Sequence, residues 1–238
     1  DREPKAAMTG DERFREPAQK AIDYIEGFQH KHGGWRYRRR EPGDTSVMGW
    51  QLMALQSARL SNTGLQVRNS TLMLADQYLD LASRSYTDRD YRQAPTGTLY
   101  RYQPTDREPK AAMTAEGILC RMYLGWKRND SRMVYALDWL IENALPDVRD
   151  RKHNLYYYYY ATQIMHHFGG QRWQKWNQHT RDLLIVKQER RGKHAGSWDP
   201  RDYKYGSSGG RIYATSLAIC TLEVYYRHLP LFKKLNLE

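Results

Sequence analysis

The densest group of side chains that could do chemistry is a run of five tyrosines, Tyr156 to Tyr160. If this run is helical, its rings cannot all face one way, because successive side chains turn about the helix axis. We expect two or three rings to pack in a core and the others to line a cavity. An aromatic wall of this kind could hold a cation, an isoprenoid or a sugar. A tyrosine-rich core with hydroxyls bonded to the backbone is the alternative.

Two acidic residues stand beside residues that begin apolar segments. Asp44 precedes Thr45, and Glu116 follows Thr114 by two positions. Asp is among the preferred residues that cap a helix N-terminus, and an acid in the first turn is favoured by the helix dipole. On residue type alone, capping therefore explains Asp44, and the helix dipole explains Glu116.

The residues that could hold a metal are few. Cys120 and Cys220 are the only cysteines, which excludes zinc modules built from several cysteines. His166 and His167 are adjacent, so on a helix they point to different faces and cannot act as a ligand pair. We predict no metal and no cofactor. The sequence also has no glycine-rich phosphate loop and no nucleophile elbow of Gly-x-Ser-x-Gly spacing.

The elements that must position these residues are predicted to be helices of two kinds. Amphipathic helices, each with one apolar stripe at steps of three and four residues, are expected over 17–29, 69–83, 131–145 and 171–188. More evenly apolar helices are expected over 45–55, 114–124, 162–168 and 215–225, each opening with a threonine. A helix that is apolar on more than one face should be buried.

The order of these segments predicts an all-α fold of about four helical hairpins, with outer amphipathic and inner apolar helices. We expect a single domain over 16–230, a tail over 1–15 and a second tail over 231–238. The nonapeptide of residues 1–9 is repeated identically at 106–114. We interpret the first copy as a tail rather than as part of the fold.

Composition narrows the classes of protein further. The chain has 238 residues and a formal net charge of +11, and aromatic residues make up 13% of it. Many aromatic residues argue against a disordered chain. No apolar run reaches the ~18 residues of a membrane span. The positive charge is scattered except at Arg36 to Arg40, and no nucleic-acid-binding motif is present, so we expect no specific nucleic-acid partner. Oligomeric state and localisation stay open, the latter between the cytoplasm and export by an upstream signal.

Two loops between an amphipathic and an apolar helix carry a more specific pattern. Gln29 is followed by Gly33, Gly34 and Trp35, and Gln188 is followed by Gly192, Gly196 and Trp198. These segments resemble the QW motif of the terpene cyclase and protein prenyltransferase superfamily, and are most similar to its small bacterial members. The resemblance implies an α/α toroid, here partial or open because only four hairpins are visible. It implies that Gln29, Trp35, Gln188 and Trp198 are structural.

The resemblance also implies where chemistry would occur. Terpene cyclases carry an acidic motif at the start of an inner helix, and Glu41 to Thr45 is the corresponding stretch; its middle acid is replaced by Gly43. Two of the three zinc ligands of prenyltransferases are also absent, because Ser46 and Ala214 stand in their places. Asp44 and Glu116 remain as candidate catalytic acids. The candidate ligand-binding residues are Tyr156, Tyr158, Tyr160, Tyr213, Arg211 and His166.

The sequence therefore predicts a toroid domain without the known catalytic sets, which binds a lipid, an isoprenoid or a peptide in a central cleft. One alternative is an isoprenoid-acting enzyme that uses Asp44 or Glu116 as a non-standard acid. The other is a protein-interaction module of a longer chain.

Overall fold

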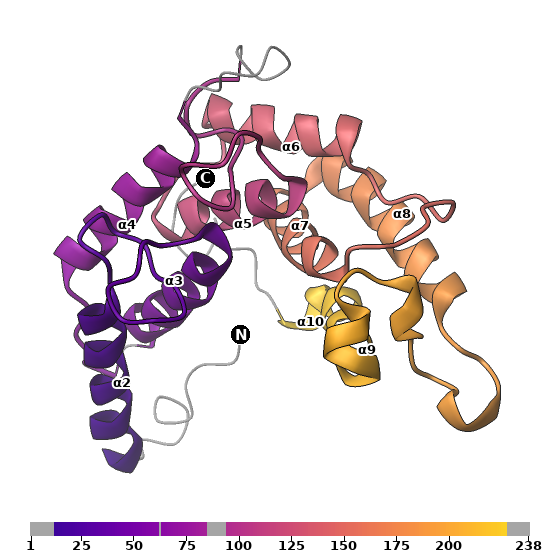
Figure 1. Ribbon diagram of the computed structural model, residues 1–238, viewed down its shortest axis with the longest axis horizontal. Coiled ribbons are helices and arrows are strands. Elements are labelled where there is room, and N and C mark those ends of the chain that lie inside the picture. Colours follow the sequence, from indigo (N-terminus) through magenta and orange to yellow (C-terminus); the bar gives the residue numbers. More distant parts are fainter. Residues whose placement is uncertain (1–11, 62, 85–93, 228–238) are drawn as a thin grey trace.

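Figure 1 shows the computed structural model of the chain, which describes residues 12–61, 63–84 and 94–227. Within these residues the regular elements are helices, with two isolated β-bridges and no strand. The expectation of an all-α fold is confirmed for this part of the chain. The α-helices are α2 (Arg15–Phe28), α3 (Thr45–Leu60), α4 (Asn69–Ala82), α5 (Ala111–Tyr123), α6 (Ser131–Asn143), α7 (Leu155–Phe168), α8 (Gly170–Lys187), α9 (Gly206–Leu222) and α10 (Val224–Arg227). Short 3-10 helices cover Glu12–Phe14, Gly192–His194 and Pro200–Asp202.

The helices form a two-layered arc (Figure 1). On its inner side, α5 packs between α3 and α7, and α7 packs in turn against α9. The amphipathic helices α2, α4, α6 and α8 lie on the outer side. Their bounds differ from the predicted ranges by no more than two residues, because an apolar stripe with a 3.6-residue period is a strong signal.

Burial distinguishes the middle of the inner layer from its end. In α7, 12 of 14 residues are buried, and α5 is buried over Met113 to Met122. The expectation that all inner helices are buried is wrong for α9, where the Ile212 side chain is 83% exposed and Ile219 is 46% exposed. This helix lies at one end of the inner layer, where its main helix neighbour within the described part of the chain is α7.

The threonines expected to open the inner helices do so only in α3. The helices α5, α7 and α9 begin at Ala111, Leu155 and Gly206, several residues before their threonines. Asn154 provides the cap of α7, since its side chain accepts a hydrogen bond from Tyr157 N. In α9 the chain kinks at Gly210, which has non-helical backbone angles.

The four threonines instead tie their helices to other segments. Thr45 Oγ1 donates to Arg101 O at 2.7 Å, whereas the hydroxyls of Thr114 and Thr215 accept from Tyr100 N and Trp198 N. Thr162 Oγ1 accepts from Trp176 Nε1 at 2.8 Å. A buried hydroxyl needs such a partner. Thr45, Thr114 and Thr215 therefore mark contacts between a helix and a loop, and Thr162 marks a contact between α7 and α8.

The loops that lead into the inner helices are bonded in pairs. Thr45 N donates to Tyr102 O at 2.9 Å, which joins the loops before α3 and α5. His153 N donates to Asp202 O at 2.9 Å and Lys204 N donates to His153 O at 2.8 Å, which joins the loops before α7 and α9. The N-terminal ends of the inner helices are therefore joined in two pairs, α3 with α5 and α7 with α9.

The two predicted tails fall largely outside the described residues. Residues 1–11, with the first copy of the nonapeptide, and residues 228–238 are not among them. The second copy forms the end of the loop before α5 and the first turn of that helix.

Candidate functional site

A cleft of about 940 Å³ lies where the inner helices begin. Ser46, Val47 and Trp50 of α3, the first turn of α5 and the start of α7 all contribute to it, together with Tyr213 of α9. This volume is in the range of small-molecule sites, which are typically 300–1,000 Å³. Its aromatic lining consists of Tyr37, Trp50, Tyr102, Tyr156, Tyr157, Tyr158, Tyr205 and Tyr213.

Three of the predicted ligand-binding residues, Tyr156, Tyr158 and Tyr213, line this cleft. Burial raises the pKa of the Tyr213 hydroxyl to about 12, because it disfavours the charged phenolate. The Tyr158 hydroxyl lies 3.3 Å from His153 Nδ1 and is oriented by that contact. The tyrosine run is thus divided between cleft and core, as its helical arrangement requires.

The other three predicted ligand-binding residues lie elsewhere. Tyr160 is buried and packs edge-to-face against Tyr156 with ring centroids 4.9 Å apart. Arg211 Nη1 pairs with Glu189 Oε1 at 2.7 Å, in the loop that precedes α9. His166 lies towards the C-terminal end of α7, ten residues beyond Tyr156, which corresponds to ~15 Å along a helix.

Glu116 is completely buried behind Tyr156 and does not line the cleft. Tyr156 Oη lies 3.0 Å from Glu116 Oε2 and 3.1 Å from Ser46 O. Oε1 of Glu116 has no hydrogen-bond partner among the described residues. It packs so tightly on α3 that a Cβ at Gly49 would come within 2.3 Å of it.

Burial favours the protonated form of Glu116. A tyrosine hydroxyl has one hydrogen, and a carbonyl can only accept. If Tyr156 donates to Ser46 O, the carboxyl of Glu116 must itself donate to Tyr156. Burial raises the pKa of Glu116 well above its usual range, which favours the same protonated form.

Asp44 caps α3, as its residue type predicted. Its Oδ1 accepts from Val47 N at 2.9 Å and from Ser46 Oγ at 2.6 Å. Its Oδ2 accepts from the Tyr102 hydroxyl at 3.1 Å and lies 3.5 Å from Arg36 Nε. Both oxygens are occupied and the residue is fully buried, so Asp44 presents no unpaired oxygen to the cleft.

The first Gln-Gly-Trp loop joins two hairpins. Gln29 follows α2, and its Nε2 donates to Gly33 O at 2.9 Å and to Thr71 O of α4 at 3.0 Å. The indole of the buried Trp35 donates to Ile25 O at 2.8 Å. Gly33 has a φ of +91°, and a Cβ there would lie 1.6 Å from a backbone oxygen of α4.

The second loop repeats the same bonds. Gln188 Nε2 donates to Gly196 O at 3.0 Å, and the indole of Trp198 donates to Leu184 O at 2.9 Å. In both loops the glutamine bonds to the glycine two residues before the tryptophan, and the tryptophan bonds four residues before the glutamine. Two sequence-distant loops with one hydrogen-bond pattern are a structural repeat.

Sequence reasoning missed the charged residues at the cleft. The cleft is lined by three lysines, Lys110, Lys152 and Lys204, and by the acidic residue Asp150. Each lysine is the N-cap residue of α5, α7 or α9 or lies within two residues of it. Their shared position before an inner helix is a signal that could have identified them. It was obscured because the predicted helix starts were several residues too late.

Two further findings concern the described residues only. They contain no group of three or more His, Cys, Asp or Glu side chains arranged to hold a metal ion. They also contain no helix of the length and hydropathy needed to cross a membrane.

Comparison of the sequence with protein-family models and with curated proteins finds no match. The function must therefore be argued from the cleft and its surroundings.

Proposed function

We propose that this chain is a binding domain of the partial α/α-toroid type, which holds a lipid, an isoprenoid or a peptide in the cleft at the N-terminal ends of its inner helices. The observation that carries this proposal is the cleft itself, with its aromatic lining and its volume of about 940 Å³. Concave, mostly aromatic sites with a few polar groups are the usual form of ligand-binding sites.

The toroid assignment is supported by two features. Outer and inner helices alternate along the chain, and the inner ones pack side by side in chain order. The loops of Gln29 and Gln188 share one pattern of hydrogen bonds. Both features are what tandem repetition of one hairpin unit would produce.

Binding without chemistry is favoured over catalysis by the positions of the two candidate acids. Both oxygens of Asp44 are occupied by protein donors. Glu116 lies behind the ring of Tyr156 and outside the cleft lining. A general acid must come within hydrogen-bond reach of the atom that it protonates, directly or through one water.

An isoprenoid-acting enzyme is the second candidate, and one observation favours it. Glu116 is a buried carboxyl with a raised pKa next to an aromatic cleft, which is the state that an acid catalyst requires. Rotation of Tyr156 would be needed to expose it. Product formation from squalene or farnesol that is lost in Glu116→Gln, measured by gas chromatography and mass spectrometry, would establish this alternative.

Occupation of the cleft can be tested with N-phenylnaphthylamine, an uncharged dye whose fluorescence rises in apolar sites. Ala112 lies on the first turn of α5 in the cleft lining. We expect Ala112→Trp to fill the cleft and to weaken dye binding at least tenfold. The matched control is Ala54→Trp, at an exposed position of α3 that is not part of the lining.

Farnesol should compete with the dye in the unaltered chain. If Ala112→Trp and Ala54→Trp bind the dye equally well, and both melt within a few degrees of the unaltered chain, the cleft is not the binding site and the proposal fails.

A further inference from the structure

The cleft carries a set of cations that an aromatic lining alone does not explain. We infer that its ligand is an acidic peptide segment, whose carboxylates contact Lys110, Lys152 and Lys204 while the rest of the peptide lies on the tyrosines. This inference rests on the proposed function, because it names the ligand class of the same cleft.

The three lysines come from three different loops and converge on one cavity. None of them forms a salt bridge within the described part of the chain, whereas Arg36, which lies outside the lining, pairs with Glu41 and Asp44. Lys110 Nζ lies 5.7 Å above the ring of Tyr102, which places its ammonium group at the cleft wall. Asp150 is the acidic residue in the lining. Cations of this kind attract a ligand with several separated negative charges.

The backbone at the same place adds positive potential. The first turn of α5, Ala111 to Met113, lines the cleft next to Lys110. Lys110 is the N-cap residue and offers no capping hydrogen bond from its side chain. Backbone N–H groups at an uncapped helix start carry part of the helix dipole. A carboxylate near Lys110 would therefore meet both a cation and backbone donors.

The composition of the wall favours a peptide over a lipid. Seven of its aromatic residues are tyrosines, and aliphatic side chains are few: Val47, Met113, Leu145 and Pro146 together with three alanines. An acyl chain gains most from aliphatic burial and needs one charged contact. Tyrosine instead provides rigid, amphipathic surface for peptide recognition at a low cost in side-chain entropy.

Two of the tyrosines that line the cleft are largely exposed to solvent. Tyr37 is 73% exposed and Tyr205 is 64% exposed. Tyr205 also has a φ of +63°, a left-handed conformation that bulky residues rarely adopt. Backbone strain of this kind concentrates at functional sites.

The test uses the full chain and a fluorescein-labelled octapeptide of alternating Glu and Gly, followed by fluorescence anisotropy. The same peptide with Gln in place of Glu, and an oligogalacturonate that competes with it, complete the set of probes. We expect the Glu peptide to bind at least tenfold more tightly than the Gln peptide. Its affinity should fall steeply between 50 and 300 mM salt, because exposed charges are screened.

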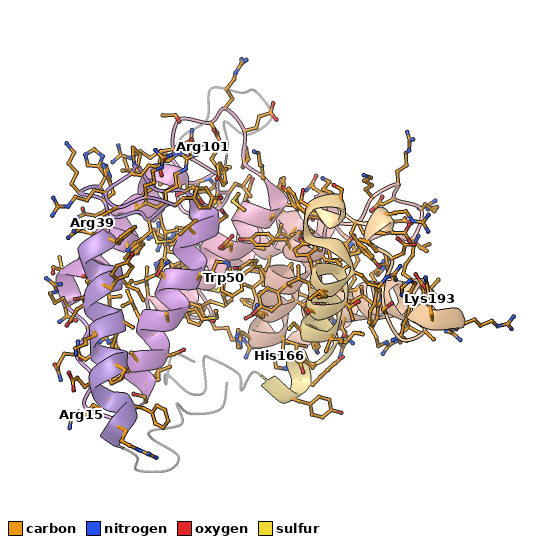
Figure 2. All side chains as sticks on the ribbon, turned by 60° about the horizontal axis from the view of Figure 1, so that its bottom comes forward. Arg15, Arg39, Trp50, Arg101, His166 and Lys193 are labelled. Atoms are coloured by element: carbon orange, nitrogen blue, oxygen red, sulfur yellow. The ribbon has the colours of Figure 1, made fainter. Side chains whose placement is uncertain are left out.

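Two triple variants separate the cleft from general charge. The variant K110Q, K152Q and K204Q changes the cleft, whereas K127Q, K175Q and K193Q removes the same charge from exposed positions outside it. In Figure 2, Lys193 lies at one end of the molecule and Trp50 lies near its middle. We expect at least a tenfold loss of peptide affinity in the first variant and less than a twofold loss in the second.

Equal losses in the two variants, or equal binding of the Glu and Gln peptides, would overturn the inference. Displacement of the naphthylamine dye by the oligogalacturonate, without binding of the Glu peptide, would overturn it in favour of an acidic sugar. In each of these cases dye binding that is still blocked by Ala112→Trp would leave the proposed function standing. If neither the Glu peptide nor the dye binds to the cleft, the acidic-peptide inference and the proposed function both fail.

Discussion

Replacing Asp44 by Asn distinguishes a simple helix cap from the fuller role that its contacts indicate. Asn keeps one carbonyl oxygen, so the hydrogen bonds from Val47 N and Ser46 Oγ can persist. Its second atom becomes an NH₂ group, which cannot accept from Tyr102 and carries no charge opposite Arg36. If Asp44 were only a helix cap, Asp44→Asn would leave the free energy of unfolding nearly unchanged, since Asn caps about as well as Asp.

The contacts give the expected magnitude. A hydrogen bond to a charged group contributes ~1.5–3 kcal/mol, which is the loss we expect for Asp44→Asn. We add nothing for Arg36, because its side chain is 27% exposed and solvent weakens the ion pair. Asp44→Ala also removes the cap, which is worth ~0.5–2 kcal/mol, so its total loss should be about 2–5 kcal/mol.

Urea unfolding followed by circular dichroism at pH 7 measures these differences, and the melting midpoint should fall by about 2–4 °C per kcal/mol for a chain of this size. The control is Asp130→Asn, at the cap of α6, where the arginine partner is 43% exposed. We expect a loss below ~1 kcal/mol there. If Asp44→Asn is as mild as Asp130→Asn, the second oxygen of Asp44 contributes nothing and the reasoning is wrong. A double-mutant cycle with Tyr102→Phe should show coupling of at least ~0.5 kcal/mol.

Three further predictions concern buried groups and one glycine. The pKa of Glu116 is raised in the folded chain, so its contribution to the free energy of unfolding is complete below the pKa of the unfolded chain and is lost as the pH rises. The variant Glu116→Gln should therefore be more stable than the unaltered chain at pH 8, and its stability in urea titrations should depend less on pH. A finding that Glu116→Gln is destabilised equally at pH 5 and pH 8 would contradict a protonated Glu116. His153 is buried and its pKa is lowered, chiefly by burial and then by Lys187. Its contribution to the free energy of unfolding should be complete above about pH 6.5 and should be lost as the pH drops through the pKa of the folded chain. His153→Gln should flatten the urea titration between pH 7.5 and 5, and an unchanged slope would speak against this assignment. Gly33→Ala should prevent folding or lower the melting midpoint far more than Gly125→Ala, because both have positive φ but no atom lies within 4 Å of a Cβ at Gly125; equal midpoints would show that the clash relaxes.

Much of the helical framework could be predicted because its signals are local. The apolar stripe that contains Ile22 predicts α2, and similar apolar stripes predict the other outer helices. The tryptophans of the two glycine-rich loops, Trp35 and Trp198, each donate a hydrogen bond to the end of the preceding helix, and their predicted structural role stays a prediction. Asp44 was expected to cap a helix because residue type and neighbours indicate it directly.

The starts of the inner helices and the composition of the cleft could not be predicted in the same way. Thr114 and Thr215 look like helix caps in the sequence, but their hydroxyls accept from loop N–H groups that are distant in the chain. The true boundary before α5 is Lys110, which has no capping side chain and hence no sequence signal. The pairing of the loops of His153 and Lys204 depends on tertiary contact, so it brings cleft residues together in a way that no local spacing reveals.

The position of α9 at the end of the inner layer has a consequence for hydrogen exchange. In an array where each hairpin packs mainly on its neighbours, a terminal hairpin can open without disrupting the middle. Amide protons of α5 and α7 should then exchange slowest, and those of α9 well ahead of them. Because Lys204, Tyr205 and Tyr213 belong to this end of the array, one wall of the cleft is on a terminal segment that can open locally. Ligands too long for the closed cleft could therefore enter by local opening of that wall while α3, α5 and α7 stay folded.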